Sequence, residues 1–114
     1  MTTNYEQVLA DAHAAATEAV AGLPDKFACG FAWVLVDGND PFARFCRAQL
    51  MAQPPEDYTA RQYFGAKGYP KGWQFWQPGK FRGQSVEAHE KGSAAFRDVL
   101  ASHGIRADVC SRLD

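Results

Sequence analysis

The sequence has few cysteines and no long apolar run. Its three cysteines, Cys29, Cys46 and Cys110, are widely spaced and form no C-x-x-C pair. We therefore expect neither a disulfide scaffold nor a structural zinc site, and a reducing compartment suits the chain better than an oxidising one. No apolar run approaches the ~18 residues that cross a bilayer, so we expect no membrane partner.

The remaining totals are those of an ordinary globular protein. Apolar residues make up 46% of the chain and charged residues 22%, which argues against disorder over most of its length. A chain of 114 residues is long enough for one core, so we expect a single domain over residues 1–114. The first twenty residues lack the basic and strongly apolar regions of a secretory leader, and we expect a cytoplasmic protein.

Although the net charge is only −1, the charge is distributed unevenly along the chain. Residues 58–84 contain no acidic residue, and they also hold eight of the fifteen aromatic residues and five of the ten glycines. Basic charge attracts anions, aromatic faces stack, and glycine lets backbone N–H groups come close to a ligand. This basic aromatic segment is the candidate binding surface, and its five basic residues are Arg61, Lys67, Lys71, Lys80 and Arg82.

The first half of the chain predicts a helix, a strand and a second helix. Residues 5–23 have a helical face made mostly of alanine, with Thr3 at the N-cap spacing of a capping box. Residues 27–36 are apolar on both alternating faces, which predicts a central strand covered above and below. Asp40 and Pro41 are the expected N-cap and first residue of the second helix.

The second half predicts a strand, a helix and a last strand. Residues 58–64 fit a strand or a helix equally well, whereas 73–77 predict a short strand. A long helix is expected over 85–103, and the alternation over 105–110 predicts a half-exposed edge strand. The last two strands are expected to run parallel through a right-handed crossover. The predicted fold is α+β, or a small α/β fold, with a three-stranded sheet and about three helices in the order α-β-α-β-α-β.

Two glycines interrupt apolar faces of these predicted elements. Gly30 lies within the first strand and Gly92 within the last helix. Glycine weakens either element unless another group must approach it closely. We therefore expect a neighbouring backbone or a ligand against each of them.

The loop before the last helix is the sharpest candidate site. It puts two cations and two glycines ahead of a helix N-terminus, whose N–H groups and macrodipole favour an anion. It is not a Walker A loop, and the alternative is a solvated turn with a serine cap. The ligand-binding residues predicted in this loop and the adjoining segment are Lys67, Tyr69, Lys71, Trp76, Lys80, Phe81, Arg82, Gly83, Gln84 and Ser85.

The sequence gives little support for catalysis. His89, Cys29 and Cys110 would make a thiol site only if the fold brought them to one end of the sheet, and their spacing does not require it. Buried structural roles are commoner for such side chains. No pair of residues has metal-ligand spacing, so we predict no metal, no cofactor and no catalytic residue.

Three local motifs carry a resemblance to known proteins. They are ACGFAWV at residues 28–34, W-x-P-x4-GQS at residues 76–85, and GIRA followed by SRLD at the C-terminal end. Together they resemble a group of short phage-encoded proteins of no assigned function. The resemblance implies a small protein made in the interior of an infected bacterium, acting on nucleic acid or on a host defence system. It implies no catalytic residue.

These observations predict a small, non-enzymatic accessory binding protein of phage type. Its basic aromatic surface, residues 58–85, would engage nucleic acid or a nucleotide. One alternative is a protein–protein inhibitor that offers the same surface to a host defence enzyme, and another is a Cys/His thiol enzyme. A monomer or a homodimer fits the sequence, which does not identify the ligand.

Overall fold

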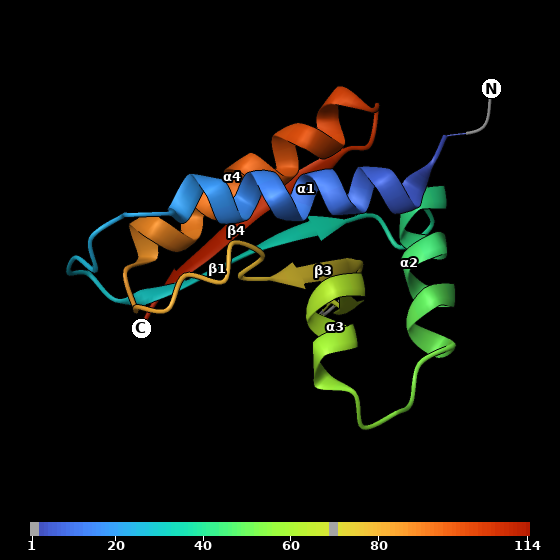
Figure 1. Cartoon of the computed structure of the whole chain (residues 1–114), viewed down its shortest axis with the longest axis horizontal. Coiled ribbons are helices and arrows are strands. Elements are labelled where there is room, and N and C mark those ends of the chain that lie inside the picture. Colours follow the sequence, from blue (N-terminus) through green and yellow to red (C-terminus); the bar gives the residue numbers. More distant parts are fainter. Residues whose placement is uncertain (1–2, 69–70) are drawn as a thin grey trace.

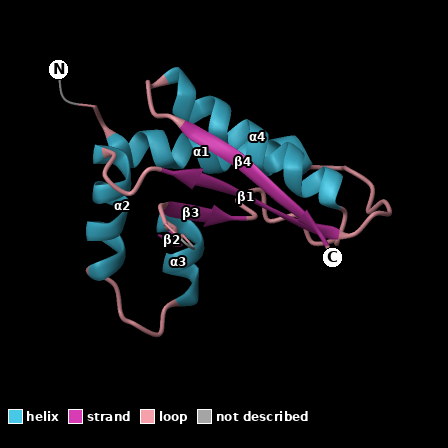
Figure 2. Ribbon diagram, turned by 180° about the vertical axis from the view of Figure 1, so that it is seen from behind, coloured by secondary structure: helices cyan, strands magenta, loops and turns pink. Residues whose placement is uncertain are grey.

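The computed structural model describes residues 3–68 and 71–114 and has helices on one face of an antiparallel sheet (Figures 1 and 2). In chain order the elements are α1 (Tyr5–Val20), β1 (Gly30–Val36), α2 (Pro41–Met51), α3 (Tyr58–Phe64), β2 (Ala66–Lys67), β3 (Trp73–Trp76), α4 (Val86–Ser102) and β4 (Ala107–Leu113). The mixed α+β class is confirmed. The described residues form four strands and four helices, however, where the sequence predicted three strands and about three helices.

The two additional elements are α3 and β2. α3 covers residues 58–64, which fitted a strand or a helix equally well, and β2 follows it in a stretch for which no strand was predicted. The Asp57 carboxylate caps α3 by accepting hydrogen bonds from the N–H groups of Thr59 and Ala60. Strand β2 has two residues, and it exists because it pairs with β3. An element of two residues is too short to leave an alternating pattern in a sequence, and its Gly-rich surroundings (GAKGYPKG, residues 65–72) are typical of a loop.

The strand order is β2-β3-β1-β4, so β1 is interior and β4 is an edge strand, as the sequence predicted. β1 pairs antiparallel with both β3 and β4. The last two strands therefore run parallel to each other, as predicted, but with β1 between them. β3, α4 and β4, with β1 between the two strands, form a split β-α-β arrangement.

Helices α1 and α4 lie side by side over one face of the sheet (Figures 1 and 2). α4 packs on β1 and β4, and the fully buried Ala12 and Ala16 let α1 come close. α2 and α3 contact each other at one end of the sheet, and α3 also contacts β3. None of the described helices is both long and apolar enough to cross a membrane.

The helix caps follow the sequence with one exception. Asp40 caps α2 ahead of Pro41, and the Ser85 hydroxyl caps α4 by accepting a hydrogen bond from the Ala88 N–H, as predicted. At α1 the cap is Asn4 rather than Thr3, because the Asn4 side chain is the one that accepts from the Gln7 N–H, at 3.1 Å.

Gly30 and Gly92 both lie where a second backbone comes close, as expected. A Cβ atom on Gly30 would lie 2.5 Å from the Arg112 carbonyl oxygen on β4. A Cβ atom on Gly92 would lie 3.2 Å from the Gly79 Cα, in the loop that crosses α4. In both cases the close neighbour is the chain itself.

Strand β1 has one covered face and one open face. Ala32, Val34 and Val36 are buried beneath the helices, whereas Phe31, Trp33 and Leu35 are only half-buried. Among the described elements no helix covers the second face, and in Figure 2 the strands lie in front of α1 and α4. The prediction that this strand is covered above and below is therefore wrong. Its small side chains face the closely packed helices, and its large ones face outward.

The core contains a histidine that the sequence analysis did not single out. His13 of α1 is 7% exposed, stacks on Tyr63 at 4.6 Å, and meets the edges of Phe75 and Phe96. Its Nε2 lies 2.7 Å from the Tyr63 carbonyl oxygen. Because a carbonyl only accepts, Nε2 carries the proton of this hydrogen bond. Burial is the largest cause that lowers the pKa of His13 from its usual 6.5, and the charge of Lys80 adds to it.

Acid is expected to destabilise the fold through His13. The unfolded chain takes up a proton near pH 6.5, but the folded chain takes it up only at lower pH. Stability is therefore full above about pH 6.5 and falls below it by up to about 1.4 kcal/mol per pH unit until the folded-state pKa is reached. Urea denaturation at pH 7.5, 6.0 and 5.0 measures this. The His13→Phe variant should show a shallower decline, and parallel declines would contradict the assignment.

Candidate binding face

The open face of the sheet is the surface of β1, β3 and β4 that points away from α1 and α4. Residues directly opposite each other in antiparallel strands share a face, so the pairing defines three rows across it. The first row is Arg112 and Phe31. The second, which we name the tryptophan row, is Cys110, Trp33 and Trp76, and the third, which we name the polar row, is Asp108, Leu35 and Gln74.

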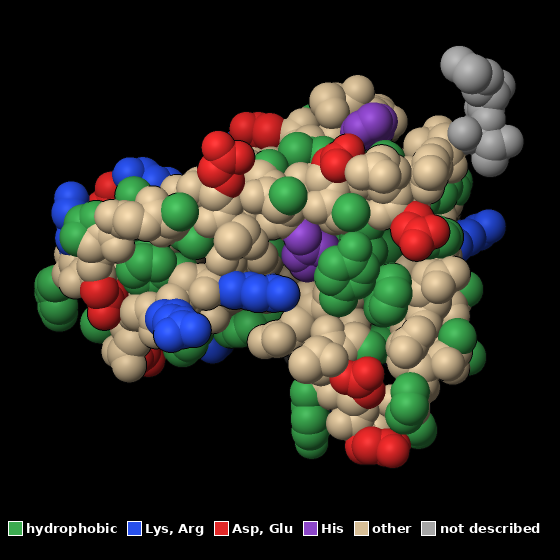
Figure 3. Space-filling view, viewed as in Figure 1, with side chains coloured by type: hydrophobic (Ala, Val, Ile, Leu, Met, Phe, Trp, Pro, Cys, Tyr) green, Lys and Arg blue, Asp and Glu red, His purple; other side chains and the backbone are tan. Residues whose placement is uncertain are grey.

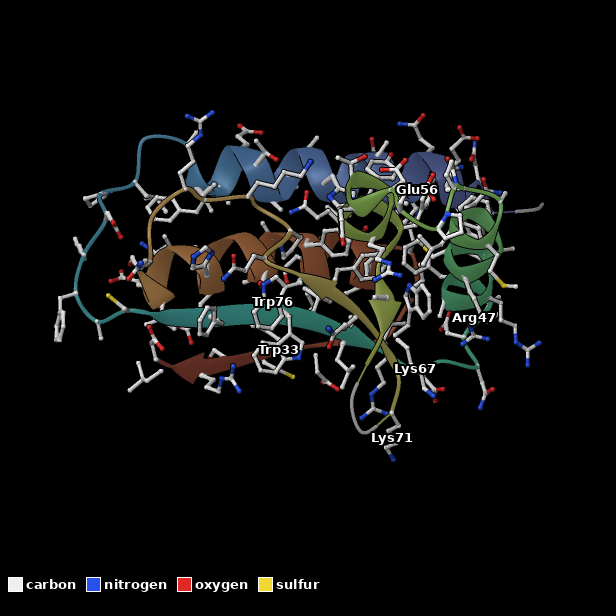
Figure 4. All side chains as sticks on the ribbon, turned by 90° about the horizontal axis from the view of Figure 1, so that it is seen from below. Trp33, Arg47, Glu56, Lys67, Lys71 and Trp76 are labelled. Carbon is white, nitrogen blue, oxygen red and sulfur yellow. The ribbon has the colours of Figure 1, made fainter. Side chains whose placement is uncertain are left out.

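The first two rows form one aromatic cluster. The Trp33 and Trp76 rings are stacked, with centroids 5.2 Å apart and an interplanar angle of 21°. The Phe31 ring lies 5.5 Å from Trp76, and the Arg112 guanidinium lies 5.4 Å from the Phe31 ring. Trp76 is 39% exposed, and Figure 4 shows the two labelled tryptophans together on β1 and β3. The cluster is therefore a solvent-accessible platform of aromatic rings with a cation at one end.

Further cations lie at the other end of the open face. Lys71 belongs to the hairpin between β2 and β3, and Figure 4 shows it on the side of the sheet away from α1. Lys67 of β2 lies directly opposite the buried Trp73 and therefore belongs to the other face. Lys71 and Arg106 line a groove of about 780 Å³ at the end of β1, which also includes Leu35 and Asp108 of the polar row. Within residues 3–68 and 71–114, neither of these two groove cations forms a salt bridge. Their charge is free to meet an anionic partner.

The residues predicted as one site lie in two separate places. Lys67, Lys71 and Trp76 lie on the hairpin and the open face, whereas Tyr69 is outside the described residues. The stretch from Lys80 to Ser85 instead follows Gly79, which packs against Ala16 and Val20 of α1. On that helix side, shown in Figure 3, acidic and basic side chains are interspersed. A segment continuous in sequence is thus divided between two surfaces.

The predicted anion position at the start of α4 is filled by the chain's own carboxylate. Asp25 Oδ1 accepts hydrogen bonds from the N–H groups of Gln84 and Ser85, both at 2.9 Å. The next N–H group, of Val86, donates to the Ala28 carbonyl. A Cβ on Gly83 would collide with the Asp25 carboxylate, so glycine leaves room for that carboxylate at this position. The N–H groups ahead of α4 do bind an anion, but this anion is the Asp25 carboxylate of the same chain.

Phe81, predicted as a stacking residue, packs within the protein. Its half-buried ring meets the edge of His89 at 5.6 Å. His89 Nε2 donates to the Gly83 carbonyl oxygen at 3.0 Å, so this buried histidine fastens the loop to α4. Lys80 and Arg82 remain exposed beside it. Phe81 and His89 hold the loop against α4, and Phe81 is not part of an exposed platform for stacking bases.

The surroundings of Cys110 and Cys46 disfavour a thiol nucleophile. Cys110 lies opposite Trp33, four residues along β1 from Cys29, and the ring of His89 is engaged by Gly83. Burial and the charge of Asp108 raise the pKa of the Cys110 thiol, and burial raises that of Cys46 to about 12. Both shifts disfavour the thiolate that a nucleophile needs. Among the described residues, no three His, Cys, Asp or Glu side chains converge to hold a metal ion.

Sequence reasoning missed most of the open face. Phe31, Trp33 and Arg112 lie outside the basic aromatic segment and join Trp76 only through strand pairing. One signal was present in the sequence. Along β1 the large side chains alternate with small ones, and the small ones match an alanine-rich helix.

Comparison of the chain with known proteins gives no match: no family model, no curated protein and no solved structure matches it. The resemblance of its three motifs to short phage-encoded proteins therefore stays a prediction, and any function has to be argued from the site.

Proposed function

We propose that the protein binds single-stranded nucleic acid on the open face of its sheet. The observation that carries this proposal is the aromatic cluster of Phe31, Trp33 and Trp76 on a sheet face that no described helix covers. Unpaired bases stack on exposed aromatic rings whatever their identity. Four-stranded sheets with aromatic rings on one face are a recurrent platform for single-stranded RNA, which supports the proposal by analogy.

The charges at the two ends of the open face support the same function. Arg112 flanks the cluster at one end, and Lys71 and Arg106 lie at the other. A backbone that crosses the rings passes these cations, whose contacts release counterions. This differs from the surface predicted from the sequence, because the stretch 80–85 is not part of it.

The test pairs a cation variant of the open face with a matched one on the loop. Lys71→Ala/Arg112→Ala removes one cation from each end of the open face, and Lys80→Ala/Arg82→Ala removes two from the loop beside the helices. Affinity for a fluorescent oligonucleotide is measured by anisotropy between about 50 and 200 mM salt. The first variant is expected to bind about tenfold more weakly, with its salt slope shallower by about 1.4, the value for two phosphate contacts on a single strand.

The loop variant is expected to stay within about threefold of the wild type, because its charges act only at a distance. Equal losses in both variants would show bulk attraction and would contradict the proposed face. The same rings and Arg112 also have the composition of a protein hot spot. If the protein instead captures a partner protein after nuclease treatment and binds no oligonucleotide, the inhibitor alternative replaces this proposal.

A further inference from the structure

We propose that the polar row of the open face reads one base of the bound strand and prefers guanine. This inference rests on the proposed binding of single-stranded nucleic acid and adds base selectivity to it. It concerns Asp108, Leu35 and Gln74, none of which takes part in the aromatic cluster.

The polar row lies one step along the strands from the tryptophan row. Residues two apart on a strand share a face and lie about 7 Å apart, so a base beside the one on Trp33 reaches Leu35. Leu35 is half-buried, with the tip of its side chain against Gly68 and Gly72 of the hairpin, and its accessible part provides an apolar floor beside them. Its direct neighbours across the sheet are Asp108 on β4 and Gln74 on β3. A base on this floor therefore has a carboxylate at one edge and an amide at the other.

Asp108 is the carboxylate in this region that the protein leaves uncommitted. Three aspartates line the adjoining groove, together with Lys71 and Arg106. The Asp37 carboxylate accepts from the Asn39 N–H and the Asp40 carboxylate from the Phe42 N–H, each at 2.8 Å. Asp108 accepts no hydrogen bond within the described part of the chain, and it forms no salt bridge there. Lys71 and Arg106 lie in the same groove, where they can contact the backbone phosphates of that nucleotide.

The chemistry of the row discriminates among the four bases. An ionised carboxylate only accepts hydrogen bonds, and guanine alone offers it two adjacent donors, N1–H and the N2 amino group. The amide of Gln74 can donate to O6 or N7 at the other edge of guanine. Adenine and cytosine offer one amino group each. Uracil offers only N3–H between two carbonyls, which the carboxylate repels.

The test uses oligouridylate of about eight nucleotides and three versions with one central guanine, adenine or cytosine. The guanine version is expected to bind the wild-type protein about tenfold more tightly than oligouridylate, which is a typical effect of one bidentate pair. In Asp108→Asn the ratio is expected to fall below about threefold, while affinity for oligouridylate stays the same or rises slightly. Asp11→Asn, on the exposed side of α1, removes the same charge and should keep the tenfold ratio.

The outcomes separate this inference from the function on which it rests. Equal affinity for all four oligonucleotides, or a guanine preference that survives in Asp108→Asn, overturns the base selectivity and leaves the binding function standing. If none of the four binds the wild-type protein, both are overturned. Because Asp108 is exposed, its variant should keep the wild-type melting temperature, which circular dichroism checks.

Discussion

Replacing Trp33 and Trp76 together by alanine is expected to weaken oligonucleotide binding by about 100-fold or more. Each base stacked on an aromatic side chain contributes about 1–3 kcal/mol, and 1.4 kcal/mol corresponds to a factor of ten. The two rings stack on each other at 5.2 Å and form the centre of the aromatic cluster. Titration by fluorescence anisotropy measures the loss, and each single variant should show about tenfold.

The matched control is Phe27→Ala, which removes an aromatic ring that is 95% exposed and lies outside the open face. It should bind like the wild type. Because Trp33 is only half-buried and Trp76 is exposed, the double variant should stay folded and lose only about 1 kcal/mol of stability from the missing cross-strand pair. A comparable loss from Phe27→Ala, or wild-type affinity in the double variant, would contradict the assignment of the site.

Replacing Phe75, the residue before Trp76, is expected to have the opposite pattern of effects. Phe75 is fully buried and packs against Phe42, Phe96 and His13. Deleting a buried phenylalanine leaves a cavity, and Phe75→Ala should lower the free energy of unfolding by about 3–5 kcal/mol. Urea denaturation monitored by circular dichroism gives the value.

The comparison with Trp76→Ala makes this result specific. Two neighbours on β3 point to opposite faces, so one change should act on stability and the other on affinity. At low temperature, where it remains folded, Phe75→Ala should still bind the oligonucleotide. A loss of more than about 2 kcal/mol in Trp76→Ala would show that this ring belongs to the core.

Much of the fold follows from local pattern. The interior position of β1, the edge position of β4 and the caps at Asp40 and Ser85 were all predicted, because each depends on neighbouring residues. The sequence did not predict that helices cover one face of β1 and leave the other open. An apolar strand face looks the same in a sequence whether a helix covers it or not, and only the contrast of Phe31 and Trp33 with Ala32 and Val34 indicated the difference.

The site was harder to predict, because it depends on contacts distant in sequence. The basic aromatic segment is continuous in the chain, but the fold sends Trp76 to the open face and leads the loop after it along the helices. Asp25 occupies the N–H groups of Gln84 and Ser85 from about sixty residues away. No local pattern shows that such an anion position is already filled.

The most direct test of the open face as the binding site is a titration followed through the three indole N–H signals in an NMR spectrum. Trp33 and Trp76 lie on the open face, whereas the Trp73 indole is buried and donates to the Phe64 carbonyl oxygen at 2.8 Å. Single-stranded oligonucleotide is expected to shift the Trp33 and Trp76 signals and leave Trp73 in place. Unmoved Trp33 and Trp76 signals, with shifts instead in the backbone of residues 80–85, would place binding on the helix side and contradict the proposal.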